Sequence, residues 1–260
     1  MASQLHLALI QTDIVWHNAS ENRKRYTDKI QKIKNGTDLV LLPEMCTTGF
    51  SMKPNRIAET MEGETVTWLC ELAKNKELVI GGSFVIEEGG NYYNRFLLAF
   101  PDGRLEYYDK RHLFTLAGEE KVYTQGNKKV FIELKGWKLC PMVCYDLRFP
   151  VWARNTNDYD VLIYVANWPK PRIAAWDTLL KARAMENMCY TIGVNRIGGD
   201  DNRLKYVGHT AAYDSLGTQI TEPAHDVERT LYATLDREHL TGTREKLNFL
   251  ADRDSFAMSL

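Results

Sequence analysis

Two short apolar runs constrain the fold of this chain more than any other feature. Residues 38–42 (DLVLL) and 160–165 (DVLIYV) are almost continuously apolar over the length of one strand. Runs of this kind are typical of β-strands that are buried on both faces. Because strand and helix patterns alternate around them, we expect a single α/β domain that spans residues 1–260.

The surrounding patterns define the other elements. Asn18 with Glu21 three residues later is a capping-box pattern, which opens a helix with Tyr26 and Ile30 on its apolar face. Further helices are expected at residues 63–74, 173–188 and 236–245, and further strands at 5–11, 78–86, 92–100, 105–108, 130–134, 138–143, 190–195, 207–213 and 231–235.

Charge and cysteine content narrow the functional classes. The chain has 33 basic and 34 acidic residues, a net charge of −1, which argues against nucleic-acid binding and against a polybasic membrane-surface protein. No apolar run approaches the roughly 20 residues of a membrane span. The N-terminal residues MASQLHLALIQTD lack a basic leader, so we read them as a first strand. The five widely spaced cysteines favour reduced thiols and a cytoplasmic protein.

Reactive side chains follow several of the predicted strands. In open α/β sheets, ligands bind beyond the carboxyl ends of the strands. Glu44, in LVLLPEMCTTGF, follows the buried run 38–42. A partly desolvated carboxylate at this place would be a good base at neutral pH, although it could instead form a salt bridge or cap a helix.

Cys144, in LCPMVCYDLRFP, has the strand-then-turn layout of a nucleophile elbow. The backbone N–H of Tyr145 would then face a developing oxyanion. The alternative is an inert core cysteine. Cys140 and Cys144 have no paired histidine or cysteine cluster nearby in the sequence, so we expect no metal.

A free thiol is mostly protonated at neutral pH, so Cys144 needs a base or a cation beside it. Lys110, in LEYYDKRHLF, follows the predicted strand 105–108 and would supply a positive charge. Its alternative is a solvated surface lysine. If the enzyme instead used a cysteine–histidine pair, His112 and His209 are the candidate bases.

Five segments together resemble the nitrilase (carbon–nitrogen hydrolase) superfamily. They are LPEMCTTGF, YDKRHLF, CYDLRFP, YVANWP and KARAMEN, and the resemblance runs from about residue 5 to residue 249. It implies a catalytic Glu-Lys-Cys triad of Glu44, Lys110 and Cys144. It also implies a second glutamate shortly after the lysine, for which the spacing favours Glu119 over Glu120.

The same resemblance implies the architecture. The family fold is a nitrilase-like α-β-β-α sandwich, and its subunits pair so that two sandwiches stack. We therefore expect a homodimer or a higher homo-oligomer with the tail, residues 248–260, at the subunit interface. The alternative is that the apolar side chains of the tail pack on their own subunit.

The motifs are most similar to those of the bacterial ω-amidase branch. This implies hydrolysis of 2-oxo-dicarboxylate monoamides (2-oxoglutaramate, 2-oxosuccinamate) by water through a Cys144 thioester, with no cofactor. The free carboxylate of such a substrate needs a cation, for which Arg148 is the first candidate and Arg172 the second. Arg148 could instead pair with Asp146.

Trp168 and Phe50 are candidates for the walls of the substrate pocket, with core packing as the alternative. Other substrates that remain open are deaminated glutathione, an N-carbamoyl compound or a nitrile. A non-catalytic binding protein on the same fold is the alternative of another class.

Overall fold

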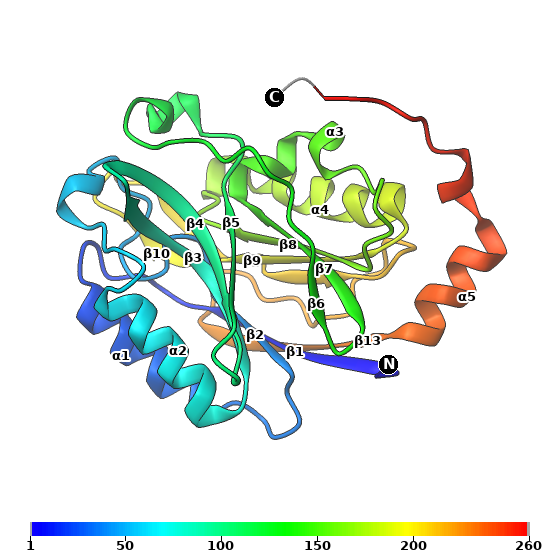
Figure 1. Cartoon of the computed structure of the whole chain (residues 1–260), viewed down its shortest axis with the longest axis horizontal. Coiled ribbons are helices and arrows are strands. Elements are labelled where there is room, and N and C mark those ends of the chain that lie inside the picture. The colour runs from blue at the N-terminus through cyan, green and yellow to red at the C-terminus, as the bar shows by residue number, and fades with distance from the viewer. Residues whose placement is uncertain (1, 259–260) are drawn as a thin grey trace.

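Two β-sheets stack face to face at the centre of the computed structural model, which describes residues 2–258 (Figure 1). The strands span Gln4–Gln11 (β1), Leu39–Leu41 (β2), Val79–Glu88 (β3), Asn91–Ala99 (β4), Leu105–Asp109 (β5), Ile132–Leu134 (β6), Trp137–Val143 (β7), Val161–Ala166 (β8), Tyr190–Asn195 (β9), Ile197–Gly199 (β10), Lys205–Val207 (β11), Ala211–Tyr213 (β12) and Arg229–Asp236 (β13). The first sheet has the order β13-β1-β2-β3-β4-β5 and the second the order β12-β9-β8-β7-β6, while β10 and β11 form a separate hairpin.

Helices cover the outer face of each sheet. The first sheet carries α1 (Ala19–Ile30) and α2 (Glu64–Lys76), and the second carries α3 (Pro150–Ala153) and α4 (Ile173–Asn187) (Figure 1). After β13 the chain forms α5 (Arg237–Leu247) and then runs along the outside as a tail, coloured red in Figure 1. The expected α-β-β-α sandwich is therefore confirmed. Within residues 2–258, no helix is both long and apolar enough to cross a membrane.

The two apolar runs form strands that are buried on both faces, as predicted. Every residue of β2 and β8 is buried. β2 pairs in parallel with β1 and β3, and β8 pairs in parallel with β7 and β9. The expected N-terminal cap is also present, since the side chain of Asn18 accepts a hydrogen bond from the backbone N–H of Glu21.

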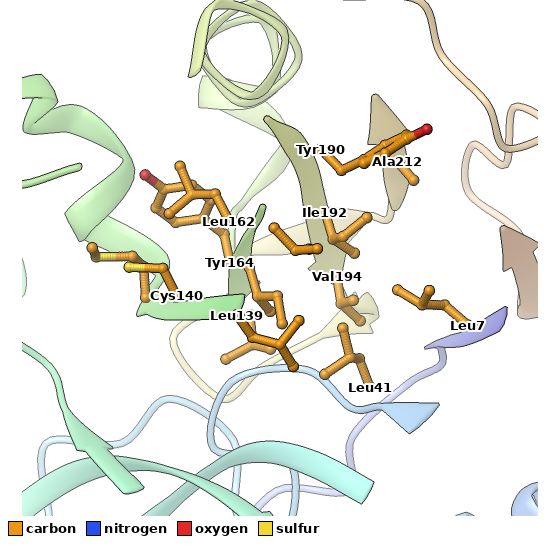
Figure 2. Close-up of a cluster of buried hydrophobic side chains, with 14 of the residues drawn as sticks. Leu7, Leu41, Leu139, Cys140, Leu162, Tyr164, Tyr190, Ile192, Val194 and Ala212 are labelled. Atoms are coloured by element: carbon orange, nitrogen blue, oxygen red, sulfur yellow. The ribbon is translucent and has the colours of Figure 1, made fainter. Parts of the chain in front are cut away.

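The inner faces of the two sheets pack against each other to form the main core. Leu7 of β1 and Leu41 of β2 approach Leu139 of β7 and Val194 of β9 (Figure 2). All four side chains are at most 1% exposed. Burial of such apolar area holds the two sheets in a fixed relation.

The prediction of one strand over residues 207–213 is wrong. The chain breaks between β11 and β12, where Gly208 and His209 take positive φ values of 75° and 62°. The side chain of Gln11 occupies this turn, and its Oε1 accepts a hydrogen bond from the backbone N–H of Thr210. β12 therefore joins the second sheet beside β9, whereas β11 leaves it as part of the β10-β11 hairpin.

A substitution at Gly193 of β9 tests how tightly α4 packs on the second sheet. A Cβ atom added to Gly193 would lie 2.3 Å from Leu180 Cδ1 and 2.7 Å from Trp176 Cζ2, both side chains of α4. We expect Gly193→Ala to lower the free energy of unfolding by about 1–3 kcal/mol, because the helix must move away. Denaturant unfolding measures the change.

Gly242 in α5 is the matched control, because no atom lies within 4 Å of its added Cβ. Gly242→Ala should stabilise the protein by up to about 1 kcal/mol through helix propensity. A Gly193→Ala protein as stable as Gly242→Ala would contradict the close packing of α4.

Candidate active site

The predicted catalytic residues come from strands of both sheets and meet at one edge of the sandwich. Glu44 follows β2 and Lys110 follows β5 in the first sheet, while Cys144 follows β7 in the second. Glu44 is 0% exposed and Lys110 is 1% exposed. Cys144 is half-buried and lines a cavity. The expectation that reactive side chains lie beyond strand ends therefore matches the geometry.

The backbone at Cys144 has the form expected for a nucleophile elbow. Cys144 has a φ of 44° and opens a 3-10 turn, Cys144–Arg148, directly after β7. The carboxylate of Asp146 closes the turn by accepting a hydrogen bond of 2.9 Å from the backbone N–H of Val143. A positive φ at a cysteine is costly, so this bond helps to hold the thiol at the edge of the cavity.

Lys110 links two buried carboxylates. Its Nζ lies 3.0 Å from Glu44 Oε1, and 3.1 and 2.8 Å from the two carboxylate oxygens of Glu119. Glu119 is 0% exposed, whereas Glu120 is exposed. Of the two glutamates that the sequence left open, Glu119 is the one that contacts the lysine.

The cluster is held together by charge in a site removed from water. Burial by itself lowers the pKa of Lys110, but the carboxylates of Glu119 and Glu44 raise it above its ordinary value. Burial raises the pKa of Glu119, and Glu44 raises it further, while Lys110 opposes both effects. One ammonium therefore serves two carboxylates that repel each other.

The same environment disfavours the thiolate form of Cys144. Desolvation and the charge of Glu44 raise the pKa of Cys144 well above its ordinary value, while Lys110 lowers it. A thiolate formed by loss of the proton to water would add a further negative charge to the cluster. Transfer of the proton from Cys144 to Glu44 leaves the total charge unchanged, so a coupled transfer is the favourable route.

Two asparagines that the sequence did not single out hold Glu44 in place. The backbone N–H of Asn167, directly after β8, donates to Glu44 Oε2 at 2.8 Å. Asn94 of β4 donates from Nδ2 to Glu44 Oε1, also at 2.8 Å. Two features of the sequence could have indicated them: Asn167 directly follows a buried apolar run, and Asn94 is a polar residue within a predicted strand.

A cavity of about 260 Å³ opens over Cys144. The predicted binding residues all line it, together with the second candidate arginine: Phe50, Tyr145, Arg148, Trp168 and Arg172. We call this space the Cys144 cavity.

Both candidate arginines of the Cys144 cavity stack on aromatic rings. The guanidinium carbon of Arg148 lies 5.0 Å from the ring centre of Trp168, and that of Arg172 lies 5.1 Å from Phe114. Neither arginine takes part in an ion pair within residues 2–258. The alternative pairing of Arg148 with Asp146 is not present, because the Asp146 carboxylate accepts from Tyr108, His112 and Val143.

The two histidines considered as rival bases lie outside the Cys144 cavity. His112 bonds through Nδ1 to Asp146 at 2.8 Å and stacks on Phe149. His209 bonds to Asp177 and stacks on His225. Their positions give no support to a cysteine–histidine pair. In the part of the chain that the structure describes, no group of three or more His, Cys, Asp or Glu side chains is arranged to hold a metal ion.

Comparisons with known proteins agree with this geometry. The carbon-nitrogen hydrolase family model matches residues 6–245. An omega-amidase of Yersinia enterocolitica is 42% identical over 258 residues, covering 98% of this chain and 99% of that protein. A 2-oxoglutaramate amidase of Bacillus subtilis is 31% identical over 251 residues, covering 95% of this chain and 96% of that protein.

A solved structure is also closely similar. A CN-hydrolase superfamily protein from Xanthomonas campestris, with an arsenic adduct in its active site, superposes with a TM-score of 0.96. It is 39% identical, and the match covers 99% of this chain and 100% of that one. The strand-end cluster, the family match and the relatives lead to one conclusion: this chain belongs to the carbon–nitrogen hydrolase family.

Proposed function

We propose that this carbon–nitrogen hydrolase is an ω-amidase, which removes the terminal amide of small 2-oxo-dicarboxylate monoamides and releases ammonia. The observation that carries the proposal is the arrangement of one cavity. Cys144 lines the cavity beside a buried carboxylate–lysine cluster, and Arg148 and Arg172, which form no ion pair within residues 2–258, line it as well. The relatives from Yersinia enterocolitica and Bacillus subtilis support the same substrate class by their names.

The reaction begins with attack of the Cys144 sulfur on the amide carbonyl carbon, while Glu44 accepts the thiol proton. Lys110 and the backbone N–H of Tyr145 stabilise the negative oxygen of the tetrahedral intermediate. The C–N bond then breaks, and Glu44 returns its proton to the nitrogen, which leaves as ammonia. The product of this half-reaction is a Cys144 thioester.

Water completes the cycle. Glu44 takes a proton from a water molecule, which attacks the thioester carbonyl, and the Cys144 sulfur leaves and recovers the proton. One carboxylate acts in turn as base and acid, so the proposed scheme uses no metal and no cofactor. Glu119 shares Lys110 with Glu44 and holds the ammonium between the two carboxylates.

The far end of the substrate decides its class. A carboxylate is bound well by a guanidinium, which offers two parallel N–H donors. Arg148 is the first candidate for this contact and Arg172 the second, since both line the Cys144 cavity. Phe50 and Trp168 line the same cavity and would flank the flat 2-oxo acid.

Other carbon–nitrogen substrates remain the alternatives: deaminated glutathione, an N-carbamoyl compound or a nitrile. The same triad would act on each of them, so the difference lies in the groups that the cavity accepts. We also propose a cytoplasmic location, which is supported by the five free cysteines.

A substrate panel with Cys144→Ala tests the activity. Ammonia release would be measured with 2-oxoglutaramate, 2-oxosuccinamate, glutamine, a simple aliphatic amide and deaminated glutathione, with a nitrile and an N-carbamoyl compound added. We expect a preference for the 2-oxo monoamides and a loss of at least about 10³-fold in kcat for Cys144→Ala. Cys70→Ala, on α2, is the control and should keep full activity.

Turnover by Cys144→Ala at a rate near that of the wild type would contradict the nucleophile assignment. Preference for another compound in the panel would overturn the substrate class and leave the nucleophile in place.

Arg148→Leu tests recognition of the carboxylate. We expect KM to rise by about 10- to 100-fold for 2-oxo monoamides, because a charge-assisted hydrogen bond is lost, and to change little for a neutral amide. Arg172→Leu is the comparison, since that arginine lines the same cavity. Equal losses on charged and neutral amides would remove the carboxylate role, and a selective effect of Arg172→Leu alone would transfer the role to Arg172.

We propose that a second copy of the chain covers the tail. Phe249, Phe256 and Met258 are 56%, 45% and 38% exposed, so they do not bury themselves on their own subunit; residues 259–260 of the predicted interface lie outside the described part. We expect the mass of a dimer or larger homo-oligomer in sedimentation, and a shift toward monomer in the double variant Phe249→Ser, Phe256→Ser. A monomeric wild-type protein would contradict this assembly.

A further inference from the structure

Asn94 lies between the two buried carboxylates of the active site. Its Nδ2 donates one hydrogen bond to Glu44 Oε1 at 2.8 Å and another to Glu119 Oε1 at 3.2 Å. The residue is 1% exposed, so water does not compete for these contacts. Each hydrogen of the amide group therefore serves a different carboxylate.

A hydrogen bond from Ser83 fixes the orientation of the Asn94 amide. Ser83 of β3 donates from Oγ to Asn94 Oδ1 at 2.9 Å, and the same Oγ accepts from the backbone N–H of Met45 at 2.9 Å. A flipped amide would aim its oxygen at two carboxylates and its NH₂ group at the hydroxyl of Ser83. The chain of donors from Met45 through Ser83 to Asn94 runs in one direction, which strengthens each bond in a dry site.

The neutral amide of Asn94 stabilises the negative charge that Lys110 alone does not balance. Two carboxylates, both 0% exposed, share one ammonium. A second cation would balance the charge but would also stabilise the ionised form of Glu44 strongly, so that Glu44 would accept the Cys144 proton less readily. A neutral donor favours the ionised form of each acid without adding a charge.

We propose that Asn94 is a positioning residue for the reaction: it holds Glu44 and Glu119 in a fixed relation and keeps Glu44 ready to accept the Cys144 proton. The inference rests on the proposed roles of Glu44 and Cys144. Asn94 acts through Glu44 rather than on the substrate, because the NH₂ group of its amide is engaged by the carboxylates of Glu44 and Glu119.

The sign of the pH effect follows from the hydrogen bonds. A carboxylate that loses a donor holds a proton more tightly, and a protonated Glu44 cannot accept the proton of Cys144. Loss of Asn94 should therefore remove activity first at low pH. The titratable groups that face this cluster are Glu44, Glu119, Lys110, Cys144, Tyr123 and Tyr206.

The main test compares Asn94→Ala with Asn155→Ala. Asn155 is 0% exposed and also uses both amide hydrogens, donating to the backbone oxygens of Tyr159 and Asn187 at 3.0 Å, away from the active site. For Asn94→Ala we expect kcat to fall by about 10- to 100-fold with a much smaller change in KM. The acid limb of the pH profile should move to higher pH. Asn155→Ala should lose thermal stability but keep kcat and the pH profile.

Two further variants sharpen the result. Asn94→Asp has nearly the same shape but replaces the donors with acceptors, so it should lose more activity at pH 7 than Asn94→Ala does. Ser83→Ala keeps Asn94 but removes its donor and the acceptor of the Met45 N–H, so it should show a smaller shift of the acid limb in the same direction. If Asn94→Ala does not fold, the pH profile of Ser83→Ala alone tests the role of Asn94.

The rate of Cys144 alkylation by iodoacetamide separates this inference from the proposed substrate. Alkylation needs no substrate, so it remains informative even if the wild type hydrolyses none of the amides in the panel. We expect Asn94→Ala and Ser83→Ala to shift the pH dependence of alkylation upward. An unchanged profile in the folded variants, or an equal shift in Asn155→Ala, would overturn the role of Asn94.

Discussion

The structure depends on one interaction, the sharing of a single buried ammonium by two buried carboxylates. Lys110 contacts both Glu44 and Glu119, and none of the three side chains reaches water. Removing charges from water is costly unless each is paired and hydrogen-bonded, so the surrounding fold must supply the remaining donors at fixed positions. Asn94, the backbone of Asn167 and the backbone of Phe114 supply them.

That requirement explains why the reactive residues lie where the two sheets meet. Glu44 belongs to the first sheet, yet Asn167 from the second sheet donates to its carboxylate and also, through Nδ2, to its backbone oxygen. A second link joins the sheets beside Cys144. The hydroxyl of Tyr108, in β5, donates to the carboxylate of Asp146 in the turn Cys144–Arg148. Apolar packing brings the sheets together (Figure 2). The polar links fix the relative positions of Glu44 and Cys144.

The distribution of charge around the Cys144 cavity is uneven. Cys144, on the cavity lining, lies beside a cluster whose formal charge is negative, while Arg148 and Arg172, which form no ion pair within residues 2–258, line the same cavity. The proposed substrate, with a neutral amide at one end and a carboxylate at the other, would match this arrangement in one orientation. The break at Gly208 contributes to the same cavity, because it releases the β10-β11 hairpin, whose Tyr206 forms part of the lining.

The sequence by itself determined the α/β class and the strand-end positions of Glu44, Lys110 and Cys144. A short run of neighbouring residues is enough to indicate both that a strand is buried on two faces and where it ends. Its resemblance to a family supplied the sandwich and the second glutamate. Only the tertiary structure decided that Glu119 rather than Glu120 contacts Lys110, that residues 207–213 form two strands, and that Asn94 joins the two acids. Each of these depends on which distant segments pack together: Ser83, Asn94 and Glu119 become neighbours through strand pairing and sheet packing, and no local pattern encodes that contact.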